Sequence, residues 1–545
     1  MAPPPSGPTQ KDTASSAAAS ESPAPAAPAV KAPPPETPTA IRRRSYIVLS
    51  FWLLVVFLGL PFWWKTTTIY RADLPLDRML EWADGKACRP AIPIQIAVHA
   101  DSLQEEEANH LVRLAQHAID DLNDFSGHHL RLQLAPRQDR PREGEHNPKS
   151  ALSIHLKPGD ATTAALDPYR AALDITYPLN SVPPLHSASS MLTTYIATEL
   201  RSTFAEEQSI VSYLLSTSSS PTSKPAGLSP AVVEALEKRA TRAVRYAPTY
   251  HLTFSLFTDG PAPTTWDIDT AINEYMKPLL DVLRPIHNFT IDTQVQLYAT
   301  PGVQSQTLTK DDLASFINAA EWPLSPSIGG APTINFLTFI GNQTIGFPDS
   351  EGQTSQSWMI PQWGTVYLLS QPDTNSHVTK DALRQPMLTF GGHLLTLLGT
   401  PQSGSLPLRL SSLSRIRSAD LLLRASDTLG SLARLSRSLP SIAIPRNVAD
   451  GVAKSIRHLE EACASLGSSE ALYHARIAEE EAERAFFEKS MVGQLYFPDE
   501  HKIAVYLPLL GPVTVPLVMG AIKEIKRLLQ ARKQRAQEAK EKKSQ

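Results

Sequence analysis

The chain has few cysteines and little net charge. Only Cys88 and Cys463 occur among its 545 residues, and no C-x-x-C motif is present. The formal net charge is −3 and the isoelectric point is near 6.6, so nothing indicates nucleic-acid binding. In an oxidising compartment the two cysteines could form a disulfide that ties the start of a domain to its end. They could equally remain as buried thiols, or one could bond to another protein.

The sequence also lacks the common catalytic motifs, with no G-x-S-x-G, P-loop, G-x-G-x-x-G or H-E-x-x-H pattern. Asp267-Ile-Asp269-Thr270 resembles the start of an aspartyl-phosphate motif, but Ala271 stands where that motif requires Thr or Val. We therefore expect this segment to cap a helix that starts near Thr270.

Three further candidates for chemistry are weak. Cys88 has no local signature of a nucleophile. His128-His129 is predicted to be a polar loop pair with too few ligands for a metal. Gly391-Gly392-His393 lies inside a helical pattern and is predicted to be a close-packing site. We expect no catalytic residue, no cofactor and no metal site.

Charge is absent from two long apolar stretches, one near each end. Tyr46–Trp64 comprises 19 residues without a charge, and Ile503–Ile522 comprises 20. A helix of about 20 apolar residues crosses the hydrocarbon core of a bilayer. The sequence therefore predicts transmembrane helices over residues 45–64 and 503–522, with a large polar block between them.

The basic residues predict which side the block faces. The second stretch is followed by a run of lysines and arginines: Lys523, Lys526, Arg527, Arg532, Lys533 and Arg535. An excess of Lys and Arg marks the cytosolic side, so the C-terminal tail is predicted to be cytosolic. Two spans place both termini on one side, and the central block is then lumenal.

Two short motifs agree with a location in the endoplasmic reticulum membrane. The glycosylation sequons at Asn288 and Asn342 both fall in the predicted lumenal block. Lys542 and Lys543, the fourth and third residues from the C-terminus, resemble the dilysine signal that retrieves membrane proteins to this compartment.

Periodicity predicts an α/β (mixed α+β) lumenal domain over 65–405, followed by a C-terminal helical arm over 406–502, bracketed by the two spans. Residues 1–44 are rich in Pro and Ala and are expected to form a disordered cytosolic tail, and 523–545 a basic cytosolic tail. Strands are expected at 92–98, 130–134, 152–156, 171–177, 250–257, 289–298, 333–340 and 365–369. Helices are expected at 102–123, 187–207, 231–245, 270–283, 311–320, 381–398, 408–438 and 446–490, with a linker at 216–230.

The second predicted span contains Pro508, Pro512 and Pro516, spaced four residues apart. Such spacing places the prolines roughly on one helix face. We expect this face either to pack against helices of other subunits or simply to mark a kinked anchor.

Two segments carry a resemblance to a known family. LPFWWKTTTIYRADLP at residues 60–75 and LYFPDEHKIAVYLP at residues 495–508 resemble the sequences that adjoin the two spans of the PIG-S family. That family provides a subunit of the glycosylphosphatidylinositol (GPI) transamidase. The enzyme attaches GPI anchors to precursor proteins in the endoplasmic reticulum.

The resemblance implies a non-catalytic subunit. In that family the chemistry belongs to a caspase-like subunit, PIG-K, and the other partners are PIG-T, PIG-U and a GAA-type subunit. Membrane lipid, GPI and the precursor protein are further expected contacts. Two alternatives remain open at this point: a lumenal domain with its own hydrolase-like activity, or a module that binds lipid or precursor.

Overall fold

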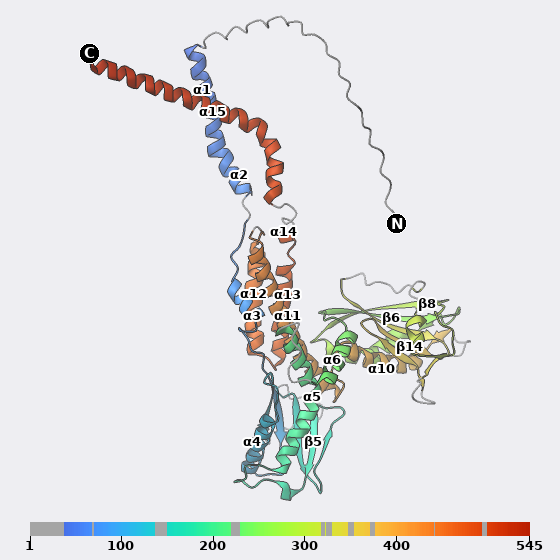
Figure 1. Ribbon diagram of the computed structural model, residues 1–545. Helices are drawn as coiled ribbons and strands as arrows, with labels where there is room; N and C mark the ends of the chain where they lie inside the picture. The colour runs from blue at the N-terminus through green and yellow to red at the C-terminus, as the bar shows by residue number, and fades with distance from the viewer. Residues whose placement is uncertain are drawn as a thin grey trace, which may run out of the picture. The chain divides into compact units, whose positions relative to one another are not determined.

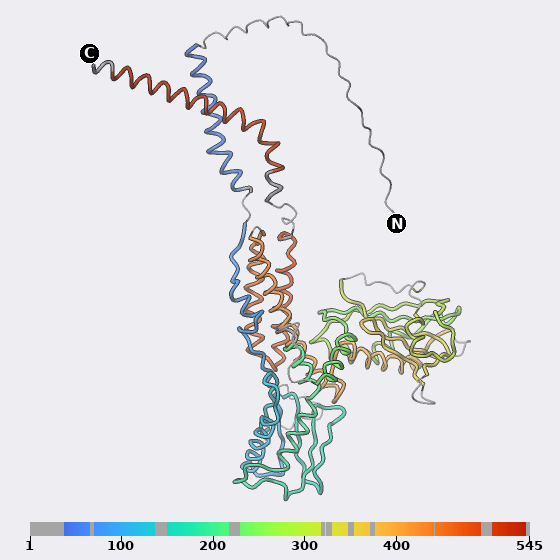
Figure 2. The backbone as a smooth tube through the Cα atoms, in the orientation of Figure 1, coloured from blue at the N-terminus to red at the C-terminus, as the bar shows by residue number. Residues whose placement is uncertain are grey.

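The computed structural model describes residues 37–67, 70–136, 150–219, 229–317, 322, 330–346, 354–370, 376–440, 442–492 and 499–544. The chain divides into two compact units (Figures 1 and 2). The terminal unit comprises residues 1–68 and 497–545, and the central unit comprises residues 69–496. Most of the expected N-terminal tail lies outside the described residues.

The terminal unit contains the two candidate membrane spans. The first is a continuous helical rod made of α1 (Pro38–Leu54), η1 (Val55–Gly59) and α2 (Leu60–Thr67), and the second lies in α15 (Asp499–Ser544). Both helices extend beyond the predicted spans, and α15 continues without a break into the basic tail. The two helices contact each other, since the indole nitrogen of Trp52 donates to the carbonyl of Leu517 at 3.2 Å.

The first lobe of the central unit is built on a five-stranded sheet in the order β2-β1-β3-β5-β4. Strands β2, β1, β3 and β5 are parallel, and β4 is antiparallel to β5. Two helices, α4 and α5, pack together beside the sheet (Figure 1). The elements are β1 (Ile92–His99), α4 (Glu105–Asp121), β2 (His128–Leu134), β3 (Leu152–Pro158), β4 (Thr163–Leu166), β5 (Ala172–Tyr177), η2 (Leu179–Ser181) and α5 (Met191–Ser219).

One face of this sheet is buried more completely than the other. The alternation expected in β1 is confirmed, because Ile92, Ile94, Ile96 and Val98 all belong to the first lobe's core. The other face carries polar side chains that are exposed or half-buried in the described residues: Gln95, Arg131, Gln133, Ser153, His155, Asp174 and Thr176.

The second lobe has a sheet in the order β13-β14-β10-β6-β8, parallel except for β13. Its central strand, β10 (Thr333–Ile340), is buried from Ile334 to Phe339, as its near-continuous apolar run predicts. The other elements of this lobe are α6 (Pro230–Arg242), β6 (Thr249–Thr258), β7 (Thr265–Trp266), α7 (Ile268–Ala271), η3 (Ile272–Met276), α8 (Lys277–Leu283), β8 (Asn288–Gln296), β9 (Thr307–Leu308), α9 (Asp312–Phe316), β11 (Thr344–Gly346), β12 (Thr354–Ser355), β13 (Ser357–Ile360), β14 (Gly364–Leu369), β15 (His377–Val378) and α10 (Lys380–Leu397).

The expected helical arm is formed by α11 (Leu406–Ser438), α12 (Arg446–Ala464), α13 (Ser469–Phe486) and the short α14 (Lys489–Val492). An N-terminal helix, α3 (Leu76–Ala83), joins them and packs on α11 (Figure 1). Gly430 of α11 permits this approach, because a Cβ atom at that position would collide with the Cβ of Ala83. The mixed α/β fold class with a C-terminal helical arm is therefore confirmed.

Several local predictions were wrong. Helix α4 begins at Glu105, three residues after the expected start at 102, and its capping box is formed by Gln104 and Glu107. Helix α5 continues to Ser219, into the segment expected to be a linker. In both places the helix boundary depends on hydrogen bonds and packing that the local pattern does not specify.

The Asp267 motif differs from the prediction, and the Gly391-Gly392 motif agrees with it in part. Helix α7 begins at Ile268, and the carboxylate of Asp267 accepts from the backbone nitrogen of Lys380 instead of capping its own helix. Gly391 is a close-packing site as predicted, because an added Cβ would lie 3.2 Å from Leu279, whereas Gly392 faces open space.

Candidate functional site

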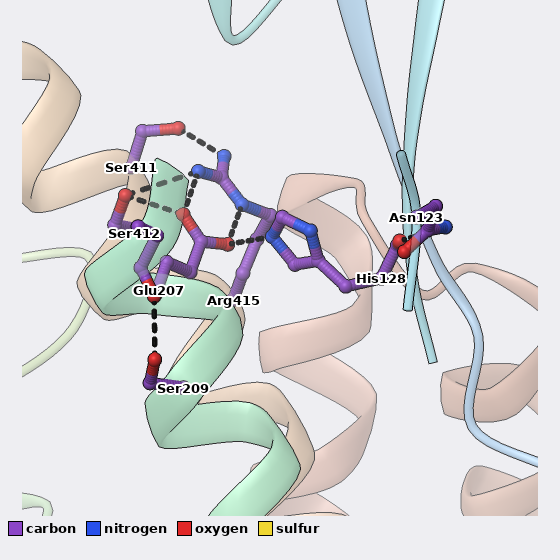
Figure 3. A network of polar contacts seen from close by, with 8 residues as sticks. Asn123, His128, Glu207, Ser209, Ser411, Ser412 and Arg415 are labelled. Carbon is purple, nitrogen blue, oxygen red and sulfur yellow. Dashed lines mark hydrogen bonds and ion pairs between the residues drawn. The ribbon is translucent and has the colours of Figure 1, made fainter. Parts of the chain in front are cut away.

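A buried ion cluster joins the first lobe to the helical arm (Figure 3). Its centre is Glu207 of α5, whose two carboxylate oxygens accept from Nε and Nη2 of Arg415 in α11, both at 2.7 Å. Both side chains are almost completely buried, at 2% and 5% exposure. A bidentate arginine–carboxylate pair of this kind fixes geometry as well as charge.

Neighbouring side chains complete the hydrogen bonds of the pair. The Ser412 hydroxyl donates to Glu207 at 2.5 Å, and Nη1 of Arg415 donates to the Ser411 hydroxyl at 2.5 Å. His128, the first residue of β2, lies with Nε2 3.6 Å from Glu207, an electrostatic contact longer than a hydrogen bond (Figure 3). The buried ion cluster thus comprises Glu207, Arg415, His128, Ser411 and Ser412.

The position of His128 corrects the sequence interpretation. His128-His129 was expected to be a polar loop pair, but both residues lie in β2, and His128 is 3% exposed. The apolar Leu130 and Leu132 follow at a spacing of two residues. That alternation places His128 on the same face of the strand as these leucines. The pattern could therefore have indicated from the sequence that His128 is buried.

The electrostatics of the cluster favour a structural role over acid–base chemistry. Burial alone would raise the pKa of Glu207, but the charge and hydrogen bonds of Arg415 outweigh it and hold that pKa below its ordinary value. The carboxylate therefore stays ionised, and its oxygens are engaged by donors. Such a group holds two elements together and does not exchange protons near neutral pH.

The predicted cysteine pair lies at a second junction. Cys88 follows α3, Cys463 lies in α12, and their sulfur atoms are bonded in the structure, with the Cα atoms 6.3 Å apart. Neither sulfur is then a free thiol that could act as a nucleophile. This pairing is the first of the three alternatives that the sequence left open.

Arg71 reinforces that junction. Its backbone forms a parallel β-bridge with Ile444, and its guanidinium donates to carbonyl oxygens at the end of α11, including those of Ser436 and Pro440. A cation at a helix C-terminus is favourable because unpaired carbonyls carry partial negative charge there. The start of the central unit is thus fastened to the arm at several points.

The sequons and the prolines lie on exposed surface. Asn288 opens the edge strand β8, and Asn342 follows β10. Pro508, Pro512 and Pro516 are exposed on α15, whereas Leu517 and Gly520, on the side that meets α1, are half-buried. Lys542 and Lys543 lie in the last turn of α15, where the backbone alone is described.

Among the described residues one group offers three metal-ligating atoms close together: His458, Glu461 and His474 in the arm. Neither this group nor the Glu207–Arg415 pair was predicted. A signal for the pair did exist, because Glu207 shares a helix face with Phe204 and Val211, and a charge on an apolar face needs a buried partner. The partner, 208 residues away, could not be identified from sequence.

Comparison with known proteins gives a consistent result. The family model described as phosphatidylinositol-glycan biosynthesis class S protein matches residues 50–531. The chain is 25% identical to the GPI transamidase component GPI17 of Saccharomyces cerevisiae, a match that covers 88% of this chain and 91% of that protein. It is 26% identical to the GPI-anchor transamidase component PIGS of Homo sapiens, over 89% of this chain and 96% of that protein.

Proposed function

The chain belongs to the family of phosphatidylinositol-glycan biosynthesis class S (PIG-S) proteins, and from this premise we propose that it is a non-catalytic subunit of the GPI transamidase. The observation that carries the proposal is the extent of the match. Residues 50–531 include the whole central unit and a large part of each candidate span, so the relationship concerns the architecture as a whole and not one module. The relatives that match along most of their length are named as transamidase components.

Its role is to support assembly or to present substrate, while the catalytic Cys and His reside on a caspase-like partner. The site geometry supports this assignment in two ways. The two cysteines of the sequence are bonded to each other, and Arg415 keeps the buried Glu207 carboxylate ionised near neutral pH. Both arrangements stabilise the central unit, and neither supplies a nucleophile or a proton donor.

The proposed topology places the central unit in the lumen of the endoplasmic reticulum and both termini in the cytosol. The basic residues beyond the second span favour this orientation. Asn288 and Asn342 are exposed, as glycan acceptors must be, and Cys88 and Cys463 are paired as an oxidising lumen allows. Glycosidase-sensitive mass that is lost in Asn288→Gln and Asn342→Gln variants would support a lumenal central unit.

The proline face of α15 is the proposed contact with other subunits in the membrane. Pro508, Pro512 and Pro516 lie beside the α1-facing side of the helix and remain exposed in the single chain. Carbonyls freed by proline need partners in lipid, and neighbouring helices can provide them. Exposed leucines and valines accompany the prolines, which suits either a helix partner or acyl chains.

The first experiment is affinity purification of the tagged full chain in mild detergent from cells that lack their own PIG-S protein. We expect recovery of a caspase-like peptidase and the other transamidase subunits, together with restored surface display of a GPI-anchored reporter. Recovery of the chain alone, under conditions in which other membrane complexes survive, would contradict the proposal. Reporter display without any co-purified peptidase would instead favour an independent lumenal activity.

A variant series tests the proline face in the same cells. Replacing Pro508, Pro512 and Pro516 together with leucine should reduce the recovered peptidase by several-fold. The matched control replaces Val513, Val515 and Val518, which are also exposed on the same helix, with leucine. Equal recovery of the peptidase with both triple variants would indicate that the prolines only kink the membrane anchor and do not contact another subunit.

A further inference from the structure

Three potential metal ligands converge between two helices of the arm. His458 and Glu461 lie three residues apart on α12, and His474 lies in the second turn of α13. The two Nδ1 atoms are 2.9 Å apart, and Oε2 of Glu461 lies 3.1 Å from Nδ1 of His458 and 2.8 Å from Nδ1 of His474. One nitrogen from each ring and one oxygen thus form a nearly equilateral triangle.

The size of this triangle suits a metal ion. Ligands at right angles around a metal with bonds of about 2.1 Å are separated by about 3.0 Å, whereas tetrahedral ligands are separated by about 3.4 Å. The three measured separations lie near the first value. An ion above the triangle would be held on one face by three protein ligands, and its remaining coordination positions would be open.

The site lies between the two helices and is partly shielded from solvent. The side chain of His458 is 12% exposed and that of His474 is 23% exposed. The two rings stack with centroids 5.2 Å apart, and their Nδ1 atoms face each other at 2.9 Å. Of the nearby cations, Lys454 pairs with Glu481 and Arg78 pairs with Glu460, and the charge of Arg457 also acts on His458.

We propose that His458, Glu461 and His474 form a binding site for one divalent transition-metal ion, of the class that takes imidazole and carboxylate ligands, for which Zn²⁺ and Co²⁺ serve as probes. Two nitrogens and one oxygen suit this class, whereas Ca²⁺ and Mg²⁺ prefer all-oxygen sites. The ion would cross-link α12 to α13 close to Cys463. This inference does not depend on the proposed function.

The test uses the full chain, purified in detergent with a tag that contains no histidines and stripped with chelator. After dialysis against Zn²⁺ we expect about one equivalent of zinc per chain, measured by elemental analysis. His458→Ala and His474→Ala should each bind zinc at least about tenfold more weakly. The matched control is His186→Ala, which alters an exposed histidine far along the chain and should bind as the wild type does.

Hydrogen exchange provides an independent readout. Zn²⁺ should slow amide exchange in α12 and α13 of the wild type, Ca²⁺ should not, and neither ion should do so in the histidine variants. Zinc content near background in the wild type, or equal zinc binding by all four proteins, would overturn the proposal. The three residues would then be a hydrogen-bonded cluster that shares a proton.

A spectroscopic measurement decides the case if both histidine variants fail to fold. Co²⁺ added to the stripped wild-type chain should give a visible spectrum distinct from that of the hydrated ion, and Zn²⁺ should abolish it. The unchanged spectrum of hydrated Co²⁺ would contradict the proposed site.

Discussion

The two sheets of the central unit differ in how they are buried. The second sheet is covered on both faces, and every residue of β10 from Ile334 to Phe339 is buried. The first sheet is also mostly parallel, yet its second face carries half-exposed polar residues such as Ser153 and His155. Parallel sheets are usually covered on both faces, so strand direction alone does not determine burial.

The lobes also differ in how they join the arm. The apolar core of the second lobe continues without interruption into α11, α12 and α13. The first lobe contributes apolar contacts as well, through Leu408 and Ile416 of α11, but a buried ion pair lies within that junction. We infer that the second lobe depends on packing volume, whereas the first depends on correct pairing of a few polar atoms.

The largest expected effect tests the ion pair. Arg415→Met leaves the buried Glu207 carboxylate without its partner and should lower the free energy of unfolding of the first lobe by about 3–5 kcal/mol. Hydrogen exchange followed peptide by peptide over α5 and β2 measures this loss. The double variant Glu207→Met/Arg415→Met should recover most of it, and Arg131→Met, which breaks an exposed pair, should cost less than about 1 kcal/mol. A double variant as unstable as the single one would contradict this account.

Packing volume is tested by truncating one leucine in each sheet. Leu337 of β10 is fully buried, so Leu337→Ala should destabilise the second lobe by about 3 kcal/mol. Leu132 of the edge strand β2 is half-buried, and Leu132→Ala should cost about 1 kcal/mol or less. Denaturant unfolding followed by tryptophan fluorescence reports the first variant, because Trp322 and Trp358 share a core with Leu337. Equal losses of unfolding free energy in the two variants would contradict the proposed difference in burial between the two sheets.

A fall in pH should destabilise the second lobe before the first. Burial, assisted by the charge of Arg417, lowers the pKa of His287 to about 3 from its ordinary value of 6.5, and its Nδ1 donates to the Ala247 carbonyl. The unfolded chain therefore binds this proton more readily, so the stabilisation is complete above pH 6.5 and falls as the pH drops towards 3. At pH 5 the second lobe should have lost about 2 kcal/mol that a His287→Gln variant retains.

The pH response of the first lobe has a different range. The pKa of Glu207 is lowered by its arginine, so the stabilisation from this carboxylate persists until the pH falls below the ordinary carboxyl range. Exchange rates compared between pH 7.5 and pH 5 should therefore change more in β6 and β8 than in β2. The opposite order would show that other groups control the acid response.

The smallest effects concern polar residues within the sheets. Thr338 of β10 is fully buried, and its hydroxyl has no hydrogen-bond partner among the described residues. Thr338→Val should therefore raise the free energy of unfolding by about 1 kcal/mol. Gln133→Ala, on the polar face of the first sheet, should change it by less than about 0.5 kcal/mol. Thermal unfolding of both variants tests the comparison, and a destabilised Thr338→Val protein would indicate an unrecognised partner for the hydroxyl.

Local patterns predicted much of the fold. Alternating isoleucines identified β1, a continuous apolar run identified β10, and the loss of strand signals after residue 405 located the arm. These features depend on residues that are near one another in sequence. Boundaries were less well predicted, as α4 and α5 show, because capping and packing determine where a helix ends.

The candidate sites were largely beyond sequence reasoning. Glu207 and Arg415 are 208 residues apart, and His458 and His474 lie on different helices, so only the folded chain brings each pair together. The cysteine pair could be proposed because the chain has no other cysteines to choose from. Histidines and carboxylates are too numerous for such elimination to work.

The fastening of Arg71 to Ile444 and of Cys88 to Cys463 has a mechanical consequence. The disulfide joins residues 375 positions apart in sequence, so the shortest covalent path through the central unit runs from α3 into the last residues of α12 and on through α13. Tension between the two ends of this unit would follow that path. Both sheets lie outside it, so they would carry almost none of the load when the membrane helices move against each other.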